Sequence, residues 1–103
     1  MKTLPNDLNF VRRTPSFPAD KIPRAILNRH NTRVGVWGKV VVESGELCYE
    51  IYDGDTQDIT ETVRLHPERH GVVEPQVWHK VTPQSDDTVF HVEFYTVPES
   101  DSE

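Results

Sequence analysis

Apolar and polar residues alternate along two stretches of the chain, residues 46–52 and 88–97, and this two-residue period predicts β-strands. A third strand is predicted at residues 34–42, which are rich in β-branched and aromatic side chains. The stretch 88–97 separates two faces most clearly. One face carries Phe90, Val92 and Phe94, and the other carries His91, Glu93 and Tyr95.

Shorter apolar runs between turn signals predict further strands at residues 25–27, 56–63, 72–73 and 77–81. Ser44-Gly45 and residues 85–87 are typical of hairpin turns. Pro75, which has no N–H and a fixed φ, predicts a corner that leaves His79 near the start of a strand. Many short strands in a chain of this length predict an all-β sandwich or small barrel over residues 25–98.

Both ends of the chain differ from this pattern. Four prolines before residue 24 break every helical pattern and predict an extended N-terminal arm, residues 1–24, that packs on the barrel. Residues 99–103 form an acidic tail that we expect to be disordered. Because an arm and open strand edges need covering, we expect a homodimer.

Composition limits the classes of partner. The net charge of -6 disfavours a nucleic-acid-binding surface. No apolar run approaches the roughly 20 residues that cross a membrane, and no signal peptide is evident at the start of the sequence. Cys48 is the only cysteine, which excludes an internal disulfide and indicates a reducing compartment. We therefore expect a soluble, cytoplasmic protein without a nucleic-acid or membrane partner.

His30, His79 and Glu93 are the candidate metal ligands. Two imidazoles and a carboxylate can bind one divalent ion while leaving positions open for water or substrate. The three residues come from separate segments, so their spacing alone does not distinguish this site from an ordinary hydrogen-bonded histidine and a solvated glutamate.

Other side chains are weaker candidates. His91 shares a strand face with Glu93, where it would orient the carboxylate or act as a fourth ligand. His66 and His70 flank Pro67 in an expected loop, which favours surface histidines over zinc-binding spacing on a helix. Trp37 and Trp78 fit either a ligand pocket or the core, and Cys48 is interpreted as an unreactive thiol.

Two segments resemble cupin motifs. Pro75-Gln76-Val77-Trp78-His79 is similar to the second motif, in which a proline precedes the metal-binding histidine at the start of a barrel strand. Residues 37–47 resemble the strand, glycine turn and return strand of the first motif. That motif's glutamate corresponds to Lys39, and its His-x-His pair falls on Thr32 and Val34, so only His79 matches a general cupin ligand.

A closer resemblance covers residues ~10 to ~98. It rests on five motifs: His30-Asn31-Thr32, Gly35-Val36-Trp37-Gly38, residues 74–81, residues 85–87 and Glu93-Phe94-Tyr95. Together they resemble the cupin-like domain at the N-terminus of the tellurite-resistance protein TehB and the stand-alone YeaR-like proteins. This resemblance implies a double-stranded β-helix, or jelly-roll barrel, and adds His30 and Glu93 to the ligand set. The methyltransferase part of TehB has no counterpart in the sequence, so no S-adenosylmethionine chemistry is expected.

Two functions follow from this resemblance. The first is a non-catalytic role in stress response or detoxification, in which the protein binds one divalent metal ion and a small molecule or oxyanion. The second is a metal-dependent enzyme of the oxygenase or isomerase type, with His91 as a possible acid or base. Zinc, iron, nickel and manganese all suit the ligands, and the sequence names no substrate.

Overall fold

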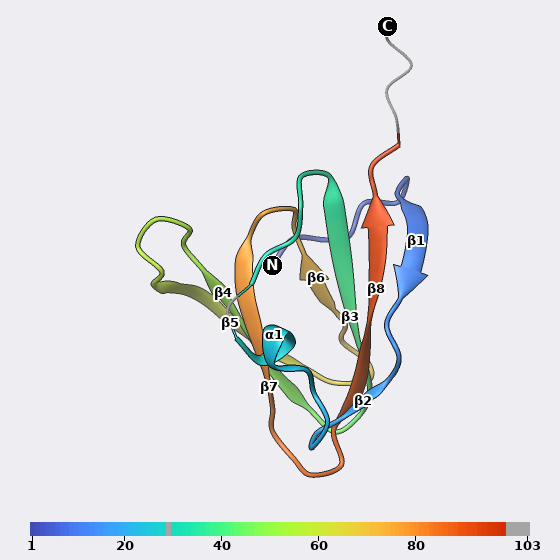
Figure 1. The fold of residues 1–103 in the computed structure, drawn as a ribbon, viewed down its shortest axis with the longest axis vertical. Coiled ribbons are helices and arrows are strands. Elements are labelled where there is room, and N and C mark those ends of the chain that lie inside the picture. The colour runs from blue at the N-terminus through green and yellow to red at the C-terminus, as the bar shows by residue number, and fades with distance from the viewer. Residues whose placement is uncertain (29, 99–103) are drawn as a thin grey trace, which may run out of the picture.

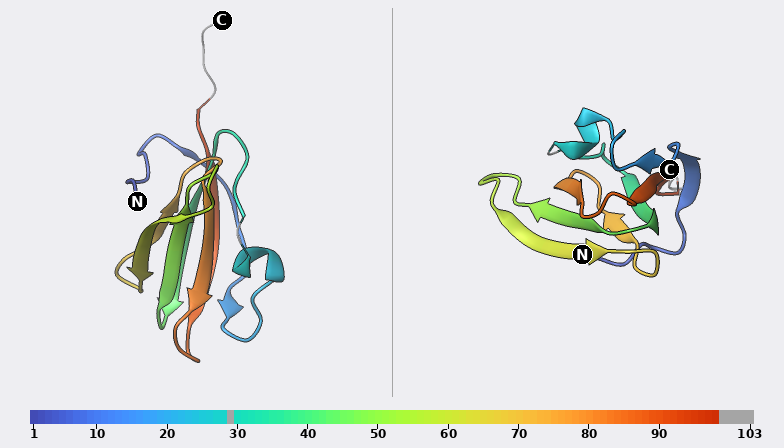
Figure 2. Two further views of the ribbon diagram at one scale, coloured as in Figure 1. Left: turned by 90° about the vertical axis from the view of Figure 1, so that its left-hand side faces the viewer. Right: turned by 90° about the horizontal axis from the view of Figure 1, so that it is seen from below.

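The computed structural model describes residues 1–28 and 30–98. Two antiparallel β-sheets face each other and enclose the core (Figures 1 and 2). The larger sheet has the strand order β1-β8-β3-β6, and β2 also pairs with β8. Its strands are β1 (Asn9–Arg13), β2 (Phe17–Pro18), β3 (Val36–Ser44), β6 (Gly71–Val73) and β8 (Val89–Thr96).

The smaller sheet has the order β5-β4-β7. Its strands are β4 (Leu47–Tyr52), β5 (Ile59–Leu65) and β7 (Trp78–Pro83). The loop between β4 and β5 projects from the body of the molecule (Figure 1). One short helix, α1 (Arg24–Leu27), lies beside β7 outside both sheets.

The alternating strand pattern determines which side chains enter the core. In the larger sheet the register pairs Val40 with Val92 and Val42 with Phe90, so these apolar residues share the inner face. The smaller sheet contributes Leu47, Tyr49 and Val81 to the same core. The Tyr49 hydroxyl donates a 2.9 Å hydrogen bond to the Val72 carbonyl and thereby joins the two sheets.

The all-β prediction is confirmed, but the two sheets do not form a closed barrel. The predicted hairpins at Ser44-Gly45 and at residues 85–87 are wrong. β3 and β4 lie in different sheets, as do β7 and β8, so both turns carry the chain from one sheet to the other. A turn signal indicates a reversal of the chain, whereas strand partners are chosen by long-range packing that local sequence does not reveal.

The strand predicted at residues 25–27 is also wrong, because this segment lies in α1. Pro23 immediately precedes the helix, where its missing N–H is not needed. The four helical residues are too few to show a helical period in the sequence.

Part of the N-terminal segment joins the larger sheet, while the Met1 amino group contacts Glu61 of β5 in the smaller sheet. β1 and β2 both pair antiparallel with β8, and Ile22 reaches the core. The predicted acidic tail, residues 99–103, lies outside the described residues. Among the described residues, no helix has the length and apolar character that crossing a membrane requires.

Candidate functional site: an inter-sheet cavity with paired histidines

A cavity of about 670 Å³ lies between the inner face of the larger sheet on one side and, on the other, β7 of the smaller sheet with residues from α1 and the segment after it. Volumes of roughly 300–1,000 Å³ are typical of small-molecule sites. Most of its wall is apolar, with Val40, Val73, Phe90 and Val92 from the larger sheet and Val81 from β7. The polar lining residues are His30, His79, Asn31, Thr32, Thr14, Arg12, Arg33 and Thr96.

His30 and His79 meet at this cavity. Their backbones exchange two hydrogen bonds of 2.9 Å, which attach the segment after α1 to the free edge of β7. Their imidazole centroids are 4.1 Å apart, with the ring planes inclined at 63°. The structure thus brings together two of the three predicted metal ligands.

The hydrogen bonds of the two rings determine which nitrogen is available to a ligand. Nδ1 of His30 is 2.8 Å from the Asn28 carbonyl, and Nδ1 of His79 is 3.0 Å from the Val77 carbonyl. Because a carbonyl only accepts, each Nδ1 carries a proton and donates it. In the neutral rings Nε2 is then the acceptor, which is also the form that binds metals.

His79 is held in this neutral form. Its side chain is buried, and this burial, together with the neighbouring His30, lowers its pKa to about 4, while the hydrogen bond to Val77 opposes the shift. At neutral pH His79 therefore presents an uncharged acceptor nitrogen. The Tyr49 ring also packs against the His79 ring, with centroids 5.9 Å apart.

Glu93 lies on the other face of the larger sheet. Phe90, Val92 and Phe94 of β8 line the cavity, and the alternation of the strand turns His91 and Glu93 outward. The predicted set of three ligands is therefore not brought together. Within residues 1–28 and 30–98, no group of three or more His, Cys, Asp or Glu side chains has an arrangement that could hold a metal ion.

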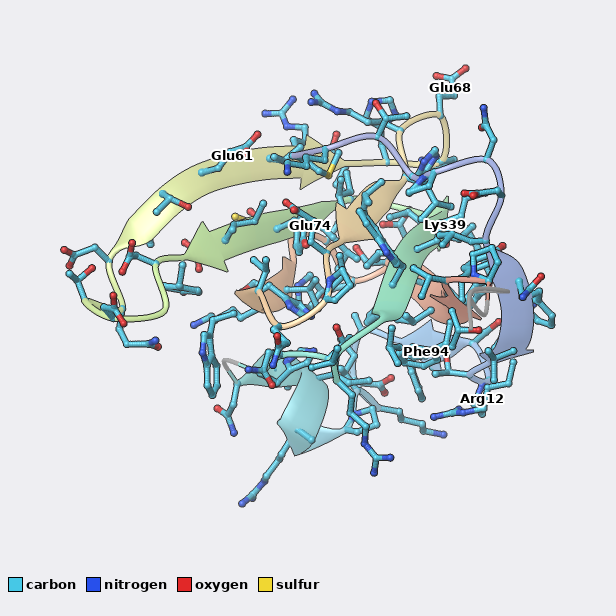
Figure 3. The ribbon with its side chains drawn as sticks, turned by 90° about the horizontal axis from the view of Figure 1, so that it is seen from above. Arg12, Lys39, Glu61, Glu68, Glu74 and Phe94 are labelled. Atoms are coloured by element: carbon cyan, nitrogen blue, oxygen red, sulfur yellow. The ribbon has the colours of Figure 1, made fainter. Side chains whose placement is uncertain are left out.

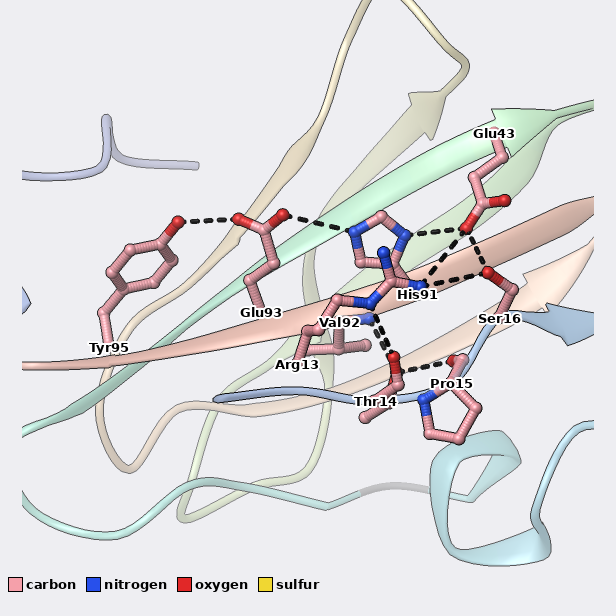
Figure 4. Close-up of polar contacts among 9 residues, drawn as sticks. All are labelled: Arg13, Thr14, Pro15, Ser16, Glu43, His91, Val92, Glu93 and Tyr95. Atoms are coloured by element: carbon pink, nitrogen blue, oxygen red, sulfur yellow. Dashed lines mark hydrogen bonds and ion pairs between the residues drawn. The ribbon is translucent and has the colours of Figure 1, made fainter. Parts of the chain in front are cut away.

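The outward residues of β8 form a separate polar network (Figure 4). Nδ1 of His91 is 2.7 Å from a Glu43 oxygen, and its Nε2 is 3.2 Å from a Glu93 oxygen. The Tyr95 hydroxyl donates a 2.6 Å hydrogen bond to Glu93, and Ser16 donates one of 2.5 Å to Glu43. The network ties the segment after β1 to β3 and β8.

These contacts favour the ionised carboxylates. Burial alone would raise the pKa of Glu93, but hydrogen bonds from Tyr95 and His91 and the nearby Lys39 outweigh it, and the net pKa is lowered. The Ser16 hydrogen bond, followed by that of His91, lowers the pKa of Glu43. The hydrogen bond to Glu93 raises the pKa of Tyr95 to about 12. We interpret the network as structural, with His91 as its centre.

Two arginines lie on the solvent side of the cavity. Arg12 and Arg33 both line it and are exposed. The Arg12 guanidinium carbon is 4.7 Å from the centroid of the Phe94 ring, and Figure 3 shows the two residues next to each other. Neither arginine is among the site residues predicted from the sequence. Arg12 lies on the edge strand β1 and Arg33 in the loop before β3, and charged residues in such places are usually solvated, so nothing in the sequence distinguishes them.

The remaining candidates lie away from the cavity lining. Trp37 and Trp78 are half-buried and are not part of it. His66 accepts a hydrogen bond from the Glu68 N–H, and His70 is exposed. Burial raises the pKa of the half-buried Cys48 thiol, which agrees with an unreactive role.

Comparison with known sequences identifies the family. The profile of the TehB-like domain matches residues 12–92. The chain belongs to the TehB-like domain family. It is 37% identical over 92 residues to the probable S-adenosyl-L-methionine-dependent methyltransferase TehB of Haemophilus influenzae, and 28% identical over 103 residues to the YeaR protein of Escherichia coli K12. These alignments cover 87% and 96% of the chain, respectively.

Solved structures support the same relationship. The crystal structure of Haemophilus influenzae TehB superposes with a TM-score of 0.82 at 34% identity, over 89% of this chain and 32% of that one. An Escherichia coli K12 protein superposes with a TM-score of 0.86 at 26% identity, over 96% of this chain and all of that one. This TehB-like domain spans about a third of TehB but most of YeaR.

Proposed function

We propose that this TehB-like domain is a non-catalytic binding module that holds a small molecule in the cavity between its sheets. The observation that carries the proposal is the contact between His30 and His79 at the wall of an otherwise largely apolar cavity. A few polar groups in an apolar pocket are the usual composition of a small-molecule site, because the apolar walls supply affinity and the polar groups fix orientation.

A divalent cation is part of this proposal. The acceptor nitrogens of His30 and His79 are of the type that binds zinc, iron, nickel or manganese, and they would supply two donors. Glu93 is on the opposite face of the sheet, so the remaining donors would come from water or from the ligand. A cation held there would act as a Lewis acid toward an anionic group of the ligand.

The position of His91 removes the acid or base that the sequence suggested for catalysis. An oxygenase or isomerase needs an acid or base within reach of the bound molecule. His91, the candidate for that role, lies outside the cavity, and both of its ring nitrogens contact carboxylates. The methyltransferase activity in the name of TehB belongs to a protein about three times as long. The relationship to TehB supports a role in tellurite resistance or stress response. The cytoplasmic location and the homodimeric state remain predictions.

A dye titration tests the proposal. N-phenyl-1-naphthylamine is an uncharged apolar molecule that fluoresces when it leaves water, and we expect saturable binding with one dye per chain. Val92→Trp adds a large side chain to the cavity wall and should weaken binding at least about tenfold, because it fills the space that the dye occupies.

The matched control is Val41→Trp, a half-buried position on the neighbouring strand that faces away from the cavity. This substitution should leave the affinity unchanged. Equal affinity in wild type and Val92→Trp, or no saturable binding to the wild type, would contradict the proposal.

A further inference from the structure

We infer that the ligand of the inter-sheet cavity is a small organic anion, whose carboxylate or other oxyanion group is bound by Arg12 while its apolar part lies among the valines and phenylalanines of the wall. This inference names the ligand class of the site and rests on the proposed function only in assigning the ligand to that cavity. It does not depend on a bound metal ion.

The first support is the charge of the lining. The protein carries a net charge of -6, yet the described residues that line the cavity include two arginines and no aspartate or glutamate. A cationic lining on an acidic protein favours anionic ligands at this position and disfavours cationic ones.

The second support is the state of the arginines. Among residues 1–28 and 30–98, neither Arg12 nor Arg33 forms an ion pair, whereas Arg13 and Arg64 each lie within 4 Å of a glutamate oxygen. The Arg12 side chain stacks on Phe94. Stacking orients the planar guanidinium while its N–H groups keep their capacity for hydrogen bonds, and these donors match the two oxygens of a carboxylate.

The third support is the apolar wall behind Arg12. Phe94, on which the guanidinium rests, itself lines the cavity, followed along the same strand face by Val92 and Phe90. A ligand that places its anionic group at Arg12 therefore extends its carbon skeleton over the apolar surface of these side chains. Inorganic anions would leave this surface uncovered, so the geometry points to an organic anion.

Two dyes of matched shape distinguish the contribution of the anionic group to the binding affinity from the contribution of the apolar part. 8-Anilino-1-naphthalenesulfonate carries the same aromatic framework as N-phenyl-1-naphthylamine plus one sulfonate. The titrations use the whole chain in EDTA, so that metal binding does not contribute. We expect the sulfonate to bind at least about tenfold more tightly than the neutral dye, a difference typical of one charge-assisted hydrogen-bonded contact.

Arg12→Gln should remove most of this advantage and leave the affinity for the neutral dye unchanged. Arg13→Gln is the control, because Arg13 is the next residue of β1 and faces Glu43 on the other side of the sheet. A loss of sulfonate affinity in Arg13→Gln equal to that in Arg12→Gln overturns the inference, and so does an equal loss for both dyes in Arg12→Gln. Binding of the neutral dye without any preference for the sulfonate also overturns it and leaves the proposed function standing. If neither dye binds the wild type, both the inference and the proposed function fail.

Discussion

His30 and His79 contact each other through both backbone and side chain. Two backbone hydrogen bonds of 2.9 Å join them, and their ring centroids are 4.1 Å apart. The contact attaches the segment after α1 to the edge of β7 and places two imidazoles at the cavity. One pair of residues thus covers part of the edge of the smaller sheet and supplies two polar side chains to the site.

The stability of the metal-free protein should depend on pH through His79. Its folded-state pKa of about 4 is below the unfolded value of ~6.5, so between these values the unfolded chain binds a proton that the folded chain does not. The contribution of neutral His79 to the free energy of unfolding is complete above pH ~6.5. It is lost as the pH falls, by about 1.4 kcal/mol per pH unit and about 3 kcal/mol in total.

Urea denaturation in EDTA between pH ~7 and ~5 measures this slope. His79→Phe should flatten this dependence of stability on pH. Partial burial also lowers the pKa of His70, a largely exposed residue, and the comparison of His79→Phe with the wild type subtracts this smaller effect. Identical pH profiles for wild type and His79→Phe would show that His79 does not titrate as described.

Metal affinity should separate the predicted ligands. Because His79 lines the cavity and Glu93 faces away, His79→Phe should weaken Zn²⁺ binding at least about tenfold, whereas Glu93→Gln should leave it unchanged. Isothermal titration calorimetry measures both. Equal losses in the two variants would restore Glu93 to the ligand set and would require a different arrangement of β8.

The hydrogen bond from the Tyr49 hydroxyl to the Val72 carbonyl, which joins the two sheets, should contribute to stability. Tyr49 is completely buried, and Tyr49→Phe leaves the buried Val72 carbonyl without this hydroxyl donor. We expect the free energy of unfolding to fall by roughly 1–3 kcal/mol. Denaturant titration gives the value, and a change below about 0.5 kcal/mol would mean that water or another donor replaces the hydroxyl.

The turn between β3 and β4 should require glycine. Gly45 has φ +72°, and a Cβ atom there would lie 2.6 Å from the Thr88 Cα and its hydroxyl. Gly45→Ala should therefore destabilise the protein by about 2 kcal/mol or more. Gly54→Ala is the control, since its nearest neighbour would be a Trp78 ring atom at 3.7 Å. Similar melting temperatures for the two variants would argue against this strain.

The sequence predicts the strands more reliably than their partners. Alternation identified β4 and β8, because burial on one face imposes a period of two, whereas β-branched and aromatic composition identified β3. Alternation also contained the evidence against Glu93 as a partner of His79: if Phe90, Val92 and Phe94 face the core, Glu93 must face outward. The crossing of the chain between sheets at Gly45 and the stacking of Arg12 on Phe94 depend on contacts between distant segments, which a single sequence does not reveal.

The central claim is that a small molecule binds between the sheets, and methyl NMR tests it most directly. Val73, Val81 and Val92 line the cavity, whereas Val41 and Val63 do not. On titration with N-phenyl-1-naphthylamine, the methyl signals of the first three should shift together and saturate at one dye per chain, while those of Val41 and Val63 stay in place. Shifts confined to Val41 and Val63, or no saturable shift at all, would contradict the claim.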